Sequence, residues 1–528
     1  MTGAWSLLRL ALRRDRVMLP LIVLGFAGTA ALSAGATVGL YPTEASRVAA
    51  AHALNATSAL IALYGRIYDP RSIAAIAMLK LSGFGTALVG LVAAILTVRH
   101  SRTEEESGRL ELIGAAAVGR LAPLGSALAL AGIASLAVGV CTAAGLIAAG
   151  LPAAGSIAFG LSWTGAGVVF AGLGAVAAQL STSARTAGGL AASAVGVAYV
   201  LRAVGDARSA AGVGWESWAS PIGWAQQVRP YAGERWWVLG LMAAATVVLA
   251  GAALALAARR DLGAGLLPDR TGPASASPRL AGPIGLLWRL ERGGLIAWTV
   301  ACAGAGAAFG GVASGVGGLL TSAQSRRFID RLGGAHGLID AFLVTELGFM
   351  GLIAAAYGIQ ATLRLRGEET GGRAEPVLAG AVGRVRWAGG GLGLALLGSA
   401  ALLLASGVAA AAARLIEGAS GREAASVIAG ALVQLPAIAV MTGLAIALFG
   451  LLPQRVGVAW AALAAVLVLG EIGRVLGLPG WVVGLSPFAH VPRIPGGSFQ
   501  PGPVAALLAV AAALSAVGLA GVRRRDLT

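Results

Sequence analysis

Residues 104–120 read EEESGRLELIGAAAVGR, and residues 368–384 read EETGGRAEPVLAGAVGR. The residues that agree are Glu104, Glu105, Gly108, Arg109, Glu111, Gly119 and Arg120 in the first stretch and Glu368, Glu369, Gly372, Arg373, Glu375, Gly383 and Arg384 in the second. The offset between them is 264 positions throughout (368 minus 104), which is half of the 528-residue chain. This constant offset indicates one unit written twice, with an acidic loop at the same place in each copy.

The composition on either side of these loops is that of a membrane protein. Hydrophobic residues make up 57% of the chain and charged residues 12%, whereas soluble domains carry about 25% charged residues. Many apolar runs reach about 20 residues, the length that crosses a bilayer. The 80 glycines lie in these runs beside alanine, a pattern typical of closely packed membrane helices. The sequence therefore predicts an all-α polytopic membrane protein.

We expect about twelve spans, six in each half. They are predicted at 17–37, 78–98, 121–149, 155–180, 186–204, 236–258, 294–320, 343–363, 386–413, 425–450, 456–476 and 503–521. The first apolar run is too long for a signal peptide and is counted as a span. Each half then starts and ends on the same side, so the halves are predicted to be parallel repeats.

The domain plan follows from this count. Residues 1–260 form the first half, 283–528 form the second, and 261–282 are a linker rich in Pro, Gly and Ser. Residues 3–16 predict an amphipathic surface helix or, equally, a basic flank of the first span. Residues 285–293 predict a second surface helix.

The net charge of +16 is explained by the preference of Lys and Arg for the cytosolic side. We expect the acidic loops, the linker and both termini to be cytosolic, in a bacterial plasma membrane, with no nucleic-acid partner.

Three shorter repeated motifs support the duplication. Ser220–Pro221 recurs as Ser486–Pro487, and Arg202 and Arg474 each precede a glycine by three positions at the end of a predicted span. Residues 259–262 (RRDL) recur as residues 524–527.

No catalytic motif is found. A phosphate-binding P-loop requires GxxxxGK followed by Ser or Thr, but the only lysine, Lys80, is followed by leucine. The four histidines have no metal-ligand spacing, and Cys141 and Cys302 lie in separate apolar runs. We therefore expect no metal site, no bound cofactor and no enzymatic activity of this chain.

The acidic loops have two interpretations. They are solvated connectors whose glutamates pair with Arg109 and Arg120, or they are surfaces that dock a partner. Their recurrence favours docking, by a short helix from Glu105 to Ile113 that carries Glu105 and Arg109 on one face.

The EExxGR-x-E loop between spans 2 and 3 resembles the coupling-helix loop of ABC-2-type exporter permeases. The whole chain resembles the fused, two-half permeases of actinobacterial polyketide-antibiotic efflux systems, the tetronasin-exporter type. This resemblance implies the type V exporter architecture and a separately encoded ATPase subunit in two copies, which binds ATP and Mg. It also implies export of hydrophobic drugs and a role in antibiotic resistance. Ala374 and Pro376 replace Leu110 and Leu112, so we expect a shorter second helix and unequal docking sites.

Polar residues at membrane depth are candidates for a cavity or an outer gate. They are Arg202, Glu346, Gln360, Gln434, Glu471 and Arg474. Glu471 and Arg474 either pair with each other or line a cavity. Trp218 and Trp224, in an outer loop, are predicted to anchor at the membrane interface in preference to forming a lid. The predicted spans consist largely of Ala, Gly, Leu and Val. This composition suits contact with large hydrophobic cargo and is equally typical of lipid-facing helices.

Two other functions stay open at this point. A proton-coupled secondary multidrug transporter also has two parallel halves, but it needs a titratable group in mid-span, and Glu346 and Glu471 lie towards span ends. A non-transporting membrane protein that recruits a cytosolic partner is the third.

Overall fold

The computed structural model describes residues 2–38, 40–56, 58–114, 117–208, 213–267, 275, 277, 282–318, 334–471 and 479–525. All regular secondary structure in these ranges is helical. The chain divides into two compact units, Met1–Gly272 and Pro273–Thr528. The division falls inside the predicted linker, 261–282.

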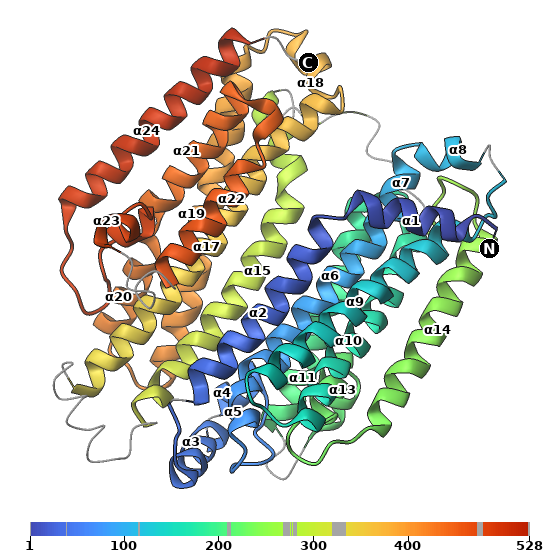
Figure 1. Cartoon of the computed structure of the whole chain (residues 1–528). Coiled ribbons are helices and arrows are strands. Elements are labelled where there is room, and N and C mark those ends of the chain that lie inside the picture. Colours follow the sequence, from blue (N-terminus) through green and yellow to red (C-terminus); the bar gives the residue numbers. More distant parts are fainter. Residues whose placement is uncertain are drawn as a thin grey trace. The chain divides into compact units, whose positions relative to one another are not determined.

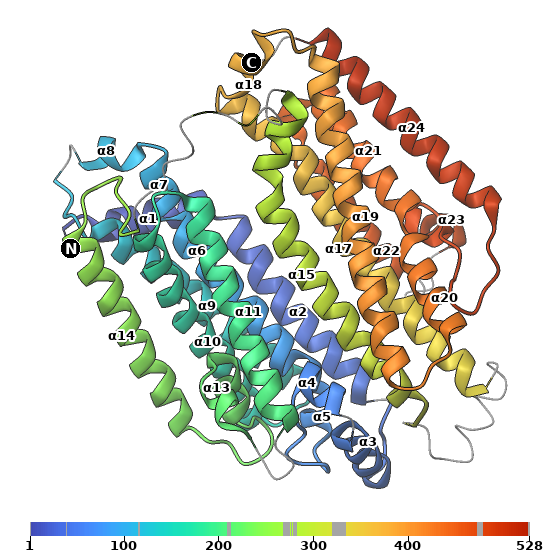
Figure 2. The same ribbon diagram turned by 180° about the vertical axis from the view of Figure 1, so that it is seen from behind.

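Unit 1 is a bundle of long helices that run alongside one another (Figures 1 and 2). Its helices are α1 (Ala4–Arg14), α2 (Met18–Val38), α3 (Glu44–Ala56), α4 (Ser58–Tyr64), α5 (Ile73–Lys80), the π-helical turn η1 (Leu81–Gly85), α6 (Thr86–Arg99), α7 (Arg102–Glu106), α8 (Arg109–Gly114), α9 (Ala122–Ala148), α10 (Ala153–Leu180), α11 (Ala184–Arg208), α12 (Trp215–Trp218), α13 (Pro221–Gln227) and α14 (Trp237–Arg259).

Helix α1 lies across one end of this bundle (Figure 1). Its apolar face buries Leu8 and Ala11 against Leu130 and Ala131 of α9. The opposite face carries arginines, as an amphipathic helix requires.

Unit 2 is a second helical bundle. Its helices are α15 (Pro283–Gly318), α17 (Gly334–Thr370), α18 (Ala374–Leu378), α19 (Arg384–Ile416), α20 (Gly421–Leu432), α21 (Leu435–Leu451), the 3₁₀ turn η3 (Pro453–Arg455), α22 (Val458–Glu471), α23 (Gly480–Val483), the 3₁₀ turn η4 (Pro487–His490) and α24 (Pro501–Arg524).

The prediction of a separate surface helix at 285–293 is wrong. Helix α15 is continuous over 36 residues from Pro283. The Gly293–Gly294 pair does not break it, and Leu287 is buried against Leu365 and Trp387. This packing keeps the segment in line with the rest of α15, whereas α1 is separated from α2 by a turn.

Eleven helical stretches of the described chain are long and apolar enough to cross a membrane, and each overlaps a predicted span. The exception is the prediction at 456–476. There, the described part of α22 has 14 residues, so this prediction is not tested over its full length. Residues 472–478 lie outside the described ranges.

Small residues allow the backbones of α21 and α24 to touch. A Cβ atom placed on Gly450 would lie 2.1 Å from the carbonyl oxygen of Gly518. Such contact between small residues is the usual way in which membrane helices pack tightly.

We expect Gly450→Ala to lower the free energy of unfolding by about 1–3 kcal/mol, because the added methyl group meets backbone that cannot move aside. The matched control is Gly393→Ala in α19, where a Cβ atom meets nothing within 4 Å. Denaturation of the purified variants in detergent measures both effects, and equal losses would contradict the packing.

Candidate functional site

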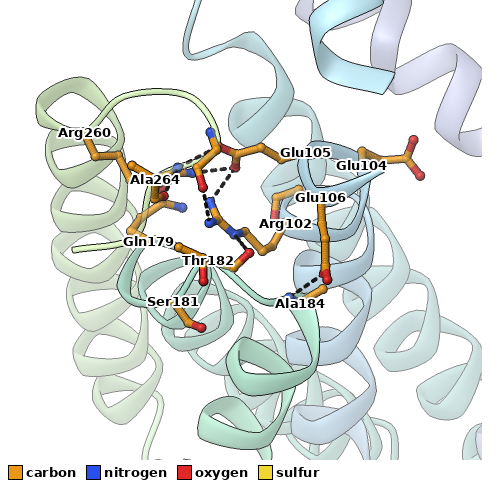
Figure 3. Close-up of polar contacts among 12 residues, drawn as sticks. Arg102, Glu104, Glu105, Glu106, Gln179, Ser181, Thr182, Ala184, Arg260 and Ala264 are labelled. Atoms are coloured by element: carbon orange, nitrogen blue, oxygen red, sulfur yellow. Dashed lines mark hydrogen bonds and ion pairs between the residues drawn. The ribbon is translucent and has the colours of Figure 1, made fainter. Parts of the chain in front are cut away.

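The acidic loop of unit 1 lies at the end of the bundle where α10 and α14 end, beside Gln179 and Arg260 (Figure 3). We call this the loop end. The predicted single helix from Glu105 to Ile113 is wrong, because the chain forms α7 and then α8, separated by Gly108. Gly108 has φ of 72°, a left-handed value that ends helices and that glycine adopts without strain. Gly372 has φ of 68° at the equivalent place in unit 2.

Arg102 stands at the centre of this site, and only 1% of its side chain is exposed. Its Nε donates to the carbonyl oxygen of Thr182 at 2.9 Å, and its Nη2 donates to that of Gly263 at 3.1 Å. Its Nη1 lies 2.9 Å from Oε2 of Glu105. Arg102 therefore joins three segments: the acidic loop, the α10–α11 turn and the start of the linker.

Glu105 binds the last helix of unit 1 through a fork of two contacts. Arg260 Nη1 lies 2.6 Å from Oε1 and Nη2 lies 2.6 Å from Oε2 (Figure 3). The backbone N–H of Gly263 donates to the same carboxylate at 2.7 Å. Paired contacts of this kind are among the strongest in proteins. We call Arg102, Glu105 and Arg260 the latch of unit 1.

The latch sets the electrostatics of Glu105. Helix α7 lies beyond Arg99, where the apolar run of α6 ends. Burial by itself raises the pKa of the Glu105 carboxyl, but the hydrogen bonds from Arg260 and Gly263 and the charge of Arg102 outweigh this effect and bring its pKa below the usual value. Glu105 is held as a carboxylate.

Unit 2 contains an equivalent latch, made of Arg366, Glu369 and Arg525. Arg525 Nη1 lies 2.7 Å from Oε1 of Glu369, and Nη2 lies 2.9 Å from Oε2. Arg366 Nη1 lies 3.1 Å from Oε2. Only 2% of the Glu369 side chain is exposed. The same three residue types therefore make the same contacts in both units.

A second contact between an acidic and a basic side chain joins the helix before each loop to the start of its unit. In unit 1, Asp15 contacts His100 at 2.6 Å and Arg99 at 3.0 Å. In unit 2, Glu291 of α15 binds Arg364 at 2.6 Å. His100 and Arg364 are again 264 positions apart. The loop of each unit is therefore tied to the end of the last helix by the latch, and the helix before the loop is tied to the start of the unit.

The other charged residues of the loops differ in their exposure, and Glu368 is buried like Glu369. Glu104 contacts Arg14 and Arg109, and Glu368 binds Arg373 at 2.9 Å. Glu111 and Glu375 are exposed, and so are Arg109 and Arg373. Leu112 is 79% exposed. Of the predicted docking residues, Glu105 and Glu369 are thus internal, and Glu111 and Glu375 are accessible.

The connector interpretation holds only in part. Glu104 pairs with Arg109, as that interpretation predicted. Arg120 instead donates to the carbonyl oxygen of Arg260, and Arg384 donates to that of Arg525 at 2.7 Å.

Arg202 lies far from the loop end. It is 18 positions along α11 from Ala184, which contacts Glu106, so it is about 27 Å away along the helix. Its guanidinium is fully buried and donates to the carbonyl oxygens of Ile61 and Leu63 at 3.3 and 3.2 Å. Asp206 lies 3.7 Å from it. These contacts fasten α11 to the end of α4.

The other residues predicted for a cavity or an outer gate are described within their own units. Trp218 stacks on Trp237, and Trp224 Nε1 donates to the Trp218 carbonyl oxygen at 2.6 Å, so both pack within unit 1. In unit 2, Gln434 is buried at the break between α20 and α21, Gln360 is exposed and Glu346 is half-buried. Arg474 and the Glu471 side chain lie outside what the structure describes.

Comparison with known proteins decides the family. The chain is 46% identical, over 529 aligned residues, to the multidrug efflux system permease protein Rv1217c of Mycobacterium tuberculosis (strain ATCC 25618 / H37Rv). The alignment covers 99% of this chain and 95% of the relative. The chain belongs to the Rv1217c permease family. Residues 280–523 also match the family described as the C-terminal domain of multidrug efflux system permease Rv1217c.

As a member of this family, the chain is a multi-pass membrane permease of an efflux system, and such a system has further subunits. A permease moves its cargo and does not transform it. The resemblance to actinobacterial efflux permeases noted from the sequence is therefore confirmed.

The sequence motifs of this permease did not point to four arginines of the acidic loop sites, which are Arg102, Arg260, Arg366 and Arg525. The sequence did contain a signal for two of these arginines. The RRDL segment at residues 259–262 and the acidic loop recur in the second half at nearly the same offset. Within the described residues, no group of three or more His, Cys, Asp and Glu side chains is arranged to hold a metal ion.

We expect Glu105→Gln to lower the free energy of unfolding by about 3–5 kcal/mol, because it leaves the buried charges of Arg102 and Arg260 without a counter-charge. Glu111→Gln, the exposed control in the same loop, should change it by less than about 0.5 kcal/mol. Denaturant unfolding in detergent compares the two variants. A small effect of Glu105→Gln would show that the latch does not support the fold.

Proposed function

We propose that this permease is the membrane-spanning part of an ATP-driven exporter, with two ABC-2 halves in a bacterial plasma membrane. Its two acidic loops face the cytosol, and each docks one copy of a separately encoded ATPase subunit that binds ATP and Mg. The cargo is a hydrophobic drug or a polyketide-like antibiotic.

The duplicated acidic loop is the observation that supports this proposal. Each unit fastens the inner carboxylate, Glu105 or Glu369, to its own bundle and exposes a second glutamate, Glu111 of α8 or Glu375 of α18, to solvent. Contact surfaces position a partner best when they rest on rigid elements. In each loop an exposed glutamate, Glu111 or Glu375, follows an exposed arginine by two positions, a mixed charge pattern that suits a specific protein partner.

The need for a separate motor rests on the sequence. The chain contains one lysine and no P-loop pattern, and the P-loop lysine is the residue that reaches the nucleotide phosphates. The family relative is a permease of an efflux system. ATP hydrolysis by another subunit of that system would supply the energy.

The proposed cargo class is supported by the composition of the helices that would contact the cargo. The long helices are built mainly from Ala, Gly, Leu and Val, which offer apolar contact with few directional groups. Binding sites of this kind favour large hydrophobic molecules.

We expect inside-out vesicles that contain this permease and its ATPase subunit to take up a hydrophobic drug only when ATP and Mg are present. Uptake should continue after a proton uncoupler is added, because the energy comes from ATP. Fluorescent drug accumulation measures it, and vesicles that lack the ATPase subunit are the control.

Two results would contradict the proposal. Loss of uptake on adding the uncoupler would indicate a proton-coupled secondary transporter, and the absence of uptake under every condition would indicate a non-transporting membrane protein.

Docking should depend on the exposed glutamates. We expect the double variant Glu111→Lys, Glu375→Lys to weaken binding of the ATPase subunit by at least about tenfold, because like charges at an interface cost several kcal/mol. Glu44→Lys is the control, since 66% of the Glu44 side chain is exposed and α3 lies at the other end of unit 1 (Figure 1). Copurification at several salt concentrations measures binding. Equal binding by both variants would exclude docking at these glutamates.

A further inference from the structure

The arginine of each latch touches two helices besides the loop. Arg260 follows the last residue of α14, and its Nε donates to Oε1 of Gln179, at the end of α10, at 2.8 Å. Arg525 follows the last residue of α24, and its guanidinium lies 4.6 Å from the ring centre of Phe449, near the end of α21. In each unit, one guanidinium therefore connects the acidic loop, the last helix and the helix on which the last helix packs.

The last helices are long and uninterrupted. Helix α14 has 23 residues and α24 has 24, so each is about 35 Å long. A displacement imposed on the C-terminal end of such a helix moves its whole length, because the helix is stiff.

Each last helix is also packed against its neighbour. On α14, Met242 and Leu249 contact Ala166 and Val169 of α10. On α24, Gly518 contacts the backbone of α21 directly. A moving last helix therefore carries its neighbour with it.

We propose that Arg260 and Arg525 are positioning residues that transmit movement of the acidic loops to the last helix of each unit. This inference rests on the proposed function, because the ATPase subunit is what moves the loops. The latch makes each loop and its last helix one body, so closure of the ATPase pair shifts α14 with α10 and α24 with α21.

A purely structural role predicts something different. If the latch only stabilises the fold, its loss lowers the amount of folded protein and leaves the cargo moved per ATP unchanged. If it transmits movement, the folded variant still binds the ATPase subunit and hydrolyses ATP but moves less cargo per ATP. The ratio of transport to hydrolysis therefore separates the two roles.

The chain provides matched controls. Arg259 and Arg524 directly precede the latch arginines, and both are exposed. Arg260→Gln and Arg525→Gln are compared with Arg259→Gln and Arg524→Gln, each in the full complex with the ATPase subunit reconstituted in vesicles. Four quantities are measured for each variant: thermal stability, copurification of the ATPase subunit, ATP hydrolysis and drug uptake.

We expect the two latch variants to reduce uptake per ATP by at least about fivefold, a typical size for coupling between two sites, with ATPase binding retained. The two controls should match the wild type. Arg260→Lys and Arg525→Lys keep the positive charge but lose the paired contacts of the guanidinium with the carboxylate. Their uptake per ATP should lie between that of the Gln variants and that of the controls. The Lys variants also replace the Gln variants if those do not fold.

Two outcomes count against the proposals, and they are distinct. If wild-type complex shows ATP-driven uptake and the folded latch variants keep the wild-type ratio, the latch does not transmit movement. If the wild-type complex shows no ATP-driven uptake, the proposed function itself is wrong.

Discussion

The organisation of each acidic loop depends on one buried carboxylate. Glu105 and Glu369 are almost entirely shielded from solvent, and a charge in such a place is tolerated only when it is paired and hydrogen-bonded. Each one meets this requirement with an arginine of its own loop and an arginine from the end of the last helix. The loop is thereby fixed to its bundle, and the same solution occurs twice in the chain.

This constraint divides each loop into an inner and an outer part. The inner carboxylate holds the loop in place, and Gly108 or Gly372, in the left-handed conformation, then redirects the chain. The following short helix, α8 or α18, exposes Glu111 or Glu375 to solvent. A permease that is driven by another subunit needs both parts, because a force applied to the outer helix reaches the bundle only if the inner part is firmly attached.

The sequence was sufficient to predict the membrane class, eleven of the spans and the repeated loops, because these depend on the length of apolar runs and on local motifs. It was insufficient to decide which glutamates of each run are buried. Glu105 and its neighbours are chemically identical, and the difference comes from Arg260, which is 155 positions away. The break of the loop helix at Gly108 and the continuity of α15 were missed for a related reason. Glycine permits either outcome, and the surrounding packing decides between them.

The most direct test of this account is photo-crosslinking from the exposed outer helices. A photoreactive amino acid at Leu112 in α8, or at Glu375 in α18, should crosslink the ATPase subunit in membranes that contain the whole complex. The same group at Trp215, which is 74% exposed and lies after α11 at the other end of unit 1, should not. Crosslinking of the ATPase subunit from Trp215, or from neither loop position, would contradict the claim that these loops receive the motor.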